Sequence, residues 1–450
     1  MELKLFIDKL FIEANKAGFI EYEVYYVDRE SLSIGIYKEE VEKYNLNNSY
    51  GLSFRGKIGD KIGYSYTEIL DDEAIQMLVK KAKENVEIIE NDDVQFIYSG
   101  DTDYAKIDTY SKELENIPAD KLIELALKME KEAKLYNNKV ESFGGCAVSY
   151  TSGKYGIVNS KGLNLTNRSN MLTAYVVPIV KVDEKMYDGF GYAIANSLEE
   201  VNPKEIAKYG VDEAMAKIGG KSIPSGNYKV VIKNEAMVSL LSTFAGIFSA
   251  DAVQKGLSLL KDKEGEEIAA SIVNLVDDPH LENGLASVGF DDEGVATSKK
   301  YVISDGKLTT LLHNLKTANK AGVKSTGNGF KSSYASPISV SPTNFYIEPS
   351  ENTFEEILKS VGNGLMITEF AGLHSGANAI SGEFSLAVNG FFIENGVVTF
   401  PVEQITVAGN FFDVIKNIEL IGNDLKFPLS SVGSPSVVIK ELSIAGERED

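Results

Sequence analysis

The amino-terminal part of the chain alternates between two apolar patterns. Between Leu3 and Ala14, apolar residues recur at helical spacing, and Gly18 follows at a position where glycine commonly ends a helix. The stretches 22–27 and 31–36 instead alternate by two, as half-buried strands do, and further short strands are indicated over 50–62. The chain is therefore predicted to begin with an amphipathic helix followed by strands.

Helical and strand patterns continue to alternate beyond these strands. Residues 72–85 and 119–135 have the apolar spacing of helices, and strand patterns return over 140–196. Ser197, with an acid three residues later, has the pattern of a helix start, and Pro203 interrupts that helix before it resumes. The first half of the chain is thus predicted to mix α and β structure.

A segment rich in Gly, Pro and Ser, residues 219–226, is the best candidate boundary in the chain. We place the domain break there, which predicts a mixed α/β domain over 1–220 and a second domain over 225–450. The 450 residues, of which 43% are hydrophobic, suffice for two cores.

The second domain is predicted to be rich in strands. Residues 228–232 have a strand pattern, and residues 235–250 predict a helix so apolar that we expect it to be buried on most sides. Strand patterns dominate from residue 269 onward, with Asp-Gly at 305 and Asn-Gly at 395 placed for tight hairpin turns. The predicted fold class is α+β, a mixed domain followed by a largely antiparallel β-rich domain with a buried helix.

Charge argues against a nucleic-acid partner. The chain has 45 Lys and Arg against 66 Asp and Glu, a net charge of -21, which repels a phosphate backbone over most of the surface. No run of basic residues with interleaved aromatics occurs. We interpret the acidity as favouring solubility.

The amino-terminal pattern and the cysteine content predict a cytoplasmic protein. Charges at Asp8, Lys9 and Glu13 fall where a signal peptide needs an unbroken apolar stretch. No apolar run reaches the roughly 18 residues of a membrane span. The single cysteine, Cys146, cannot form an intramolecular disulfide, which suits a reducing compartment.

Metal ligands are scarce. The three histidines, His280, His313 and His374, are not at helical or strand spacing from one another or from Cys146. A site would need long-range convergence of all three, so we favour surface or hydrogen-bonded roles for each.

Adjacent carboxylates occur at 277–278 and 291–292. Paired acids can divide the roles of acid and base when their surroundings separate their pKa values. They are also typical of turns before Pro and Gly, where Asp accepts hydrogen bonds from its own backbone. We favour the turn interpretation.

Two polar segments are candidates for contact with a substrate or partner. The first places His374 beside Ser375 and Gly376, although sequence neighbours seldom face each other as a catalytic pair. The second is a Gly-containing loop that could offer backbone N–H groups to a peptide or anion, or serve only as a structural turn. Its residues are Ser325, Thr326, Gly327, Asn328 and Gly329.

Short motifs in the second half resemble the TldD/PmbA family, a peptidase family also called modulator of DNA gyrase. They follow one another in that family's order and spacing, and those after residue 372 are closer to the PmbA/TldE branch. The motifs are Gly289–Gly294, Ser304–Leu308, Ser325–Gly329, Asn344–Pro349, Gly372–Gly376, Ser381–Ser385, Ile393–Gly396, Ile405–Asn410, Gly433–Val437 and Leu442–Gly446.

The resemblance places a zinc motif in the apolar helix. TldD subunits carry His-Glu-x-x-x-His there, and a carboxyl-terminal cysteine completes the zinc site. In this chain Ser242 and Ile247 occupy the histidine positions, Thr243 occupies the glutamate position, and residues 425–436 contain no cysteine. Because zinc prefers thiolate, imidazole or carboxylate ligands, we expect no zinc and no catalytic residue in this chain.

The PmbA/TldE branch similarly lacks the motif, and its members associate with TldD to form a protease of unfolded peptides and of precursors of modified peptides. The resemblance implies a non-metal subunit that contributes to the proteolytic chamber, with zinc in a TldD-like partner. A homodimeric peptide-binding scaffold without protease activity is the first alternative. A metal-independent hydrolase using His374 and Ser375 or a carboxylate pair is the second.

Overall fold

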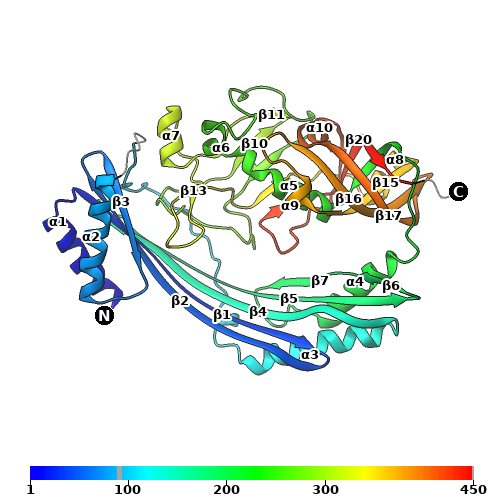
Figure 1. Cartoon of the computed structure of the whole chain (residues 1–450), viewed down its shortest axis with the longest axis horizontal. Coiled ribbons are helices and arrows are strands. Elements are labelled where there is room, and N and C mark those ends of the chain that lie inside the picture. The colour runs from blue at the N-terminus through cyan, green and yellow to red at the C-terminus, as the bar shows by residue number, and fades with distance from the viewer. Residues whose placement is uncertain (89–93, 448–450) are drawn as a thin grey trace.

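The computed structural model describes residues 1–88 and 94–447, and it combines a long curved sheet with a β-rich body on the concave side of that sheet (Figure 1). The last residues of the predicted 225–450 domain and a short piece of the 1–220 domain lie outside the described residues. Every strand of the curved sheet lies within 21–195, and every other strand lies within 226–445. The α+β fold class is confirmed.

Seven strands form the curved sheet, in the order β3-β2-β1-β4-β5-β6 with β7 also on β5. All neighbouring pairs are antiparallel, and the long strands of the hairpins β1–β2 and β4–β5 give the sheet its length. The strands are β1 (Glu21–Tyr37), β2 (Glu40–Ile58), β3 (Lys61–Thr67), β4 (Val140–Asn159), β5 (Asn164–Val182), β6 (Lys185–Asp188) and β7 (Gly191–Ala195).

The prediction of separate strands at 22–27 and 31–36 was wrong, because β1 runs through both. Asp28, Arg29 and Glu30 are exposed and interrupt the apolar pattern, but their backbone still pairs with β2 on one side and β4 on the other. Backbone hydrogen bonds to both neighbouring strands therefore keep residues 28–30 in the strand, although no described helix covers their side chains.

Four helices cover the convex face of the sheet in two groups. Helices α1 (Leu3–Lys16) and α2 (Asp72–Ile88) pack on Val24 and Phe54 at one end. Helices α3 (Ala119–Tyr136) and α4 (Pro203–Ala216), preceded by the short helix η1 (Lys112–Leu114), pack on β1, β4 and β5 at the other end. The predicted helices at 3–14, 72–85 and 119–135 are confirmed.

The predicted helix start at Ser197 was wrong. Helix α4 begins at Pro203, whose fixed φ suits the first helical position, and the Asn202 side chain caps it by accepting from Lys204 N and Glu205 N. The acid at Glu200 instead accepts from Asn196 N at 2.8 Å, so it stabilises a loop. Pro203 therefore begins the helix that we expected it to interrupt.

The β-rich body contains a six-stranded sheet, a five-stranded sheet and a small β-hairpin. The six-stranded sheet contains β8 (Gly226–Ile232), β15 (Gly364–Ala371), β16 (Glu383–Glu394), β17 (Val397–Asn410), β18 (Ile418–Ile421) and β20 (Val437–Ala445). The five-stranded sheet contains β9 (Leu275–Asp277), β10 (Lys300–Ser304), β11 (Lys307–Leu308), β14 (Phe345–Ile347) and β19 (Val432–Gly433), and the small hairpin contains β12 (Gly329–Phe330) and β13 (Ser339–Val340).

Short helices connect these sheets. They are α5 (Asn234–Phe244), η2 (Ala245–Phe248), α6 (Ala250–Gln254), α7 (Leu315–Ala321), α8 (Phe354–Val361), α9 (Leu373–Gly376) and α10 (Phe411–Lys416).

The two predicted tight turns are confirmed. Asp305 and Gly306 both have positive φ, 48° and 79°, and so do Asn395 and Gly396, 51° and 76°. These are the conformations that two-residue hairpins require.

The apolar helix predicted over 235–250 is buried but discontinuous. Its apolar residues, including Leu240 and Phe244, are part of the largest core of the protein, as expected. Helix α5 ends at Phe244, η2 follows, and α6 begins only at Ala250. Gly246 within η2 favours this break because glycine weakens a helix interior.

No helix within the described residues is long and apolar enough to cross a membrane.

Candidate functional site

The three motif positions on and after α5 have different surroundings. The Ser242 side chain is exposed, and Thr243 donates through Oγ1 to Ser239 O of its own helix at 2.9 Å. Ile247, in η2, is 1% exposed within the apolar core. A hydroxyl in solvent, a hydroxyl bonded to its helix and a buried hydrocarbon provide no zinc-binding set, so these residues do not fit the zinc that the TldD motif would hold at these positions.

The segment expected to carry a third ligand is nevertheless held against α5. Asn234, the first residue of α5, donates through Nδ2 to Asp424 O at 3.0 Å and through its backbone N–H to Ser436 Oγ at 3.1 Å. Ser436 in turn donates from N and Oγ to the Asp424 carboxylate at 2.8 and 2.6 Å. The network joins the start of the helix to Ser436, the last residue of 425–436, and to Asp424, the residue before its first.

His374 and Ser375 do not form a catalytic pair. Both lie exposed on the short helix α9, and Ser375 Oγ donates to Gly372 O at 3.3 Å instead of interacting with His374. Gly376 follows in the same turn, close to the backbone of β16. Helix α9 lies beside α5 (Figure 1).

The remaining histidines and the cysteine have separate partners. His280 Nε2 lies 3.2 Å from Thr297 Oγ1, whereas His313 is 4% exposed and burial lowers its pKa. Cys146 donates to Ala126 O in the core of the first domain, where burial raises its thiol pKa to about 12. No cluster of His, Cys, Asp and Glu within residues 1–88 and 94–447 has the geometry of a metal site.

The loop Ser325–Gly329 is a structural element. Thr326 N and Asn328 N donate to His313 O, Gly327 N donates to Ser325 Oγ, and Gly329 N donates to Asp291 Oδ2. Four of the five N–H groups of this loop, those of Thr326, Gly327, Asn328 and Gly329, therefore have protein acceptors and are not available to a peptide or anion. The alternative, a structural turn, is the observed one.

The adjacent carboxylates are turn residues only in part. Asp278 accepts from His280 N and Asp291 accepts from Glu293 N, the short-range bonds that the turn interpretation predicts. Asp277, however, is fully buried at the end of β9 and accepts from Lys300, Asn328 and Thr343. Turn propensity could not reveal a buried polar network made by residues distant in sequence.

A cluster of buried charges lies where the curved sheet meets the β-rich body. Glu23 and Arg55 face each other across β1 and β2, and Arg55 donates from Nε at 3.0 Å and from Nη2 at 2.5 Å. Glu293, 5% exposed, lies close enough for its charge to act on Arg55. Asp292 Oδ2 accepts from Lys331 N at 2.7 Å.

Burial shifts the pKa of several groups in this cluster. It raises the pKa of Asp292 to about 6 and that of Glu293 to about 7, and it lowers the pKa of Lys331 to about 7. Burial and the charge of Glu293 raise the pKa of Asp291. Glu23, Arg55 and Lys331 were not predicted as site residues. For Glu23 and Arg55 the available signal was a charged residue inside a strand pattern, and Lys331, in a polar segment, offered none.

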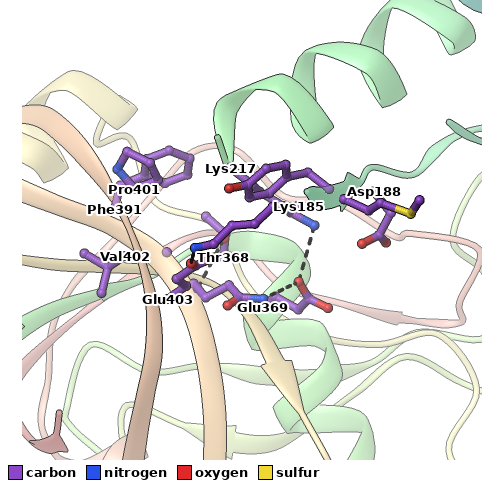
Figure 2. A pocket seen from close by; sticks show the side chains of 13 residues that line it. Lys185, Asp188, Lys217, Thr368, Glu369, Phe391, Pro401, Val402 and Glu403 are labelled. Atoms are coloured by element: carbon purple, nitrogen blue, oxygen red, sulfur yellow. Dashed lines mark hydrogen bonds and ion pairs between the residues drawn. The ribbon is translucent and has the colours of Figure 1, made fainter. Parts of the chain in front are cut away.

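The opposite end of the curved sheet also contacts the β-rich body. Lys426 pairs with Glu235 at the start of α5 and lies over the rings of Tyr192 and Tyr209. Nearby, Lys185 pairs with Glu403 and Lys217 pairs with Glu369, beside a cavity of about 260 Å³ (Figure 2). The body therefore touches the sheet at both ends.

Between these contacts, the concave face of the sheet is polar and only partly covered. Tyr25 marks the concave face, because it packs with Phe290 of the β-rich body in a shared core. Alternate residues of a strand share one face, so every second residue from Tyr25 along β1, with its partners on the neighbouring strands, also lies on the concave face. The positions of this face from Arg29 to Gly35 of β1, with their partners on β2, β4 and β5, carry no carboxylate, whereas Glu23 and Glu40 lie on the same face beyond them. The residues at these carboxylate-free positions are Lys43, Asn45, Asn47, Ser49, Gly35, Ser33, Ser31, Arg29, Ala147, Ser149, Thr151, Gly153, Tyr175, Thr173, Met171 and Ser169.

Three segments of the chain match the PmbA/TldA metallopeptidase family. Residues 22–86 match its domain 1, residues 112–218 its central domain and residues 225–446 its C-terminal domain. The fold and these matches define a protein of the PmbA/TldA class.

Known relatives agree with these matches. The chain is 30% identical over 332 residues to Metalloprotease PmbA of Escherichia coli O157:H7, covering 74% of this chain and 71% of that protein. A Thermotoga maritima structure named for modulation of a DNA gyrase is 34% identical, with a TM-score of 0.92 over 99% of this chain and 100% of that one. The chain belongs to the PmbA/TldD family.

The fold is also shared with TldE from Thermococcus kodakarensis. That structure has a TM-score of 0.90 at 19% identity, over 98% of this chain and 100% of that one. At this identity the likeness concerns the fold alone.

Proposed function

We propose that this chain is the non-metal subunit of a two-subunit metalloprotease. The observation that carries the proposal is the state of α5: Ser242 is exposed, Thr243 is bonded to its own helix and Ile247 is in the core. The helix and the 425–436 segment are still held together through Asn234, as a retained scaffold requires. Zinc and its general base belong, in this proposal, to a TldD-like partner.

The proposed contribution of this chain is to form part of the chamber and to hold unfolded or precursor peptides. The concave face supports this role because hydroxyl and amide groups hydrogen-bond to a peptide backbone whatever its side chains are. The absence of carboxylates from this part of the face also matters in a chain of net charge -21, since an acidic peptide would meet no local repulsion there.

Reconstitution with a His-Glu-x-x-x-His homologue tests the proposal. The two proteins should copurify, bind about one zinc ion per TldD-like subunit, and cleave an unfolded peptide that neither protein cleaves alone. A partner in which the motif glutamate is replaced by glutamine is the matched control and should assemble without activity. Activity that is unchanged when this chain is omitted would contradict the proposal.

A further inference from the structure

A second cavity, of about 330 Å³, lies beside the buried charge cluster. It is formed between the β2–β3 end of the curved sheet and the loop that follows Lys331 in the β-rich body. This volume is at the lower end of the range typical of small-molecule sites. Exposed Tyr66, which lines it, connects it with solvent.

The cavity has both apolar walls and buried polar groups. Ile62, Phe96 and Ile338 supply hydrocarbon surface. Glu293 and Asn314 line the cavity although they are only 5% and 3% exposed. An apolar lining with a few fixed polar groups is the usual construction of a small-molecule site.

Arg55 and Lys331, the cations around Glu293, have other bonded partners within the protein, although the charge of Glu293 also acts on both. Arg55 has Glu23 as its direct partner, at 2.5 Å. Lys331 Nζ donates to Tyr64 Oη and Ser336 O, at 3.1 and 3.0 Å, and lies near the charge of Asp292.

The buried carboxylate of Asp291 is stabilised by three hydrogen bonds, which it accepts from backbone N–H groups. Glu293 is different. Its carboxylate accepts from Leu315 N at 2.7 Å and forms no ion pair with any residue in the described part of the chain. A buried carboxylate without a bonded cation is costly even where the charge of Arg55 acts on it from a distance, so this one is suited to a positively charged ligand.

We infer that this cavity binds small molecules carrying a primary ammonium group on an apolar or aromatic body, with Glu293 as the counter-ion. The ammonium donates to the Glu293 carboxylate, the body lies against Ile62, Phe96 and Ile338, and Asn314 is available to an amide of the ligand. Free amino-acid derivatives and the amino terminus of a peptide both have this chemistry. The inference does not depend on the proposed protease role.

The charges facing Glu293 give the binding a pH dependence. Burial raises the pKa of Glu293 to about 7, with Arg55 opposing the rise and Glu23 and Asp292 adding to it. Lys331 loses its proton over a similar range, and Lys316 at the cavity is paired with Asp251. Deprotonation of both groups makes the cavity more negative, so ammonium binding strengthens from pH 6 to pH 8 and releases a proton from Glu293.

Isothermal titration calorimetry on the full chain tests this site with three probes. L-phenylalaninamide should bind, and N-acetyl-L-phenylalaninamide, which lacks the ammonium, should bind at least about tenfold more weakly. Phe-Gly-Gly-amide distinguishes the two kinds of ligand. If it binds as tightly as phenylalaninamide, the ligand is the amino terminus of a peptide, and if it does not bind, the ligand is a free amino-acid derivative. Equal affinity for the acetylated probe, or no binding of phenylalaninamide, would overturn the inference.

Two variants test ligand binding at this site independently of the stability of the fold. Glu293→Gln keeps the acceptor for Leu315 N but should weaken phenylalaninamide binding at least about tenfold, whereas the exposed Glu282→Gln should leave it unchanged. Ala335→Phe fills the cavity from its half-buried wall without altering any charge, and it should abolish binding. Retained affinity in folded Ala335→Phe would overturn the site even if Glu293→Gln failed to fold.

Discussion

Arg55 and Glu23 form a buried ion pair across two neighbouring strands at the junction between the curved sheet and the β-rich body. Arg55 is 8% exposed and Glu23 is 1% exposed, and the second oxygen of Glu23 accepts from Asn159 Nδ2 at 3.2 Å. Glu293 from the β-rich body adds a further negative charge nearby. The pair therefore lies within the contact between the two parts of the chain.

Arg55→Met should be strongly destabilising. The change leaves Glu23 buried without its cation beside a second carboxylate, and breaking a buried pair in this way costs about 3–5 kcal/mol. Urea unfolding followed by circular dichroism measures the loss. Lys121→Met, which removes an exposed pair with Glu124, is the control and should leave the unfolding midpoint unchanged. Equal effects of the two substitutions would contradict the buried-pair account.

Glu293 should make the fold less stable as pH rises from 4.5 to 7. Its pKa is raised to about 7 in the folded state, so the folded state holds the proton over a range in which the unfolded state has lost it. The stability associated with this proton is present below pH 4.5 and is lost as pH rises through 7, a change on the order of 2–3 kcal/mol.

Glu293→Gln removes that titration and should flatten the dependence, so the variant gains stability relative to wild type at pH 7 but not at pH 4.5. Urea midpoints measured across this range provide the test, with Glu282→Gln as the exposed control. Above pH 7 stability should recover in both proteins, because the unfolded state protonates Lys331 more than the folded state does. Parallel pH profiles for Glu293→Gln and wild type would contradict the prediction.

The sequence predicted those elements whose cause is local. Helix α1 follows from the apolar spacing that places Phe6 and Leu10 on one face, and the hairpin at Asp305 follows from residues that tolerate positive φ. The error at Ser197 was also local, because Asn202 and Pro203 form a better helix start.

The buried site was not predictable in the same way. Glu23, Arg55, Glu293 and Lys331 come from three distant segments, and only the folded topology brings them together. The same reason explains the loop after Ser325, whose polar composition indicated exposure although its acceptors lie on other elements. Composition does not show which polar groups find partners inside the protein.

The two histidine positions of the family motif should respond differently to histidine. Ile247→His removes core contacts and buries an imidazole without a partner, which should cost about 2–4 kcal/mol. Ser242→His adds a side chain to an exposed position and should change stability by less than about 0.5 kcal/mol. Thermal unfolding of both variants tests this difference, and a similar loss in each would show that the two positions share one environment.

A carboxylate on the concave face should weaken the proposed peptide binding. Thr151 is half-buried in the middle of this face, opposite Ser31, so Thr151→Glu places a negative charge among neighbouring positions that carry no carboxylate. For an acidic unfolded peptide cleaved by the reconstituted complex, KM should rise about 3- to 10-fold through like-charge repulsion. Ser152→Glu is a closely matched control, because the next residue of the same strand points to the convex face and should leave KM unchanged. If both variants raise KM equally, the effect comes from net charge or from damage to β4, and the concave face is not the peptide surface.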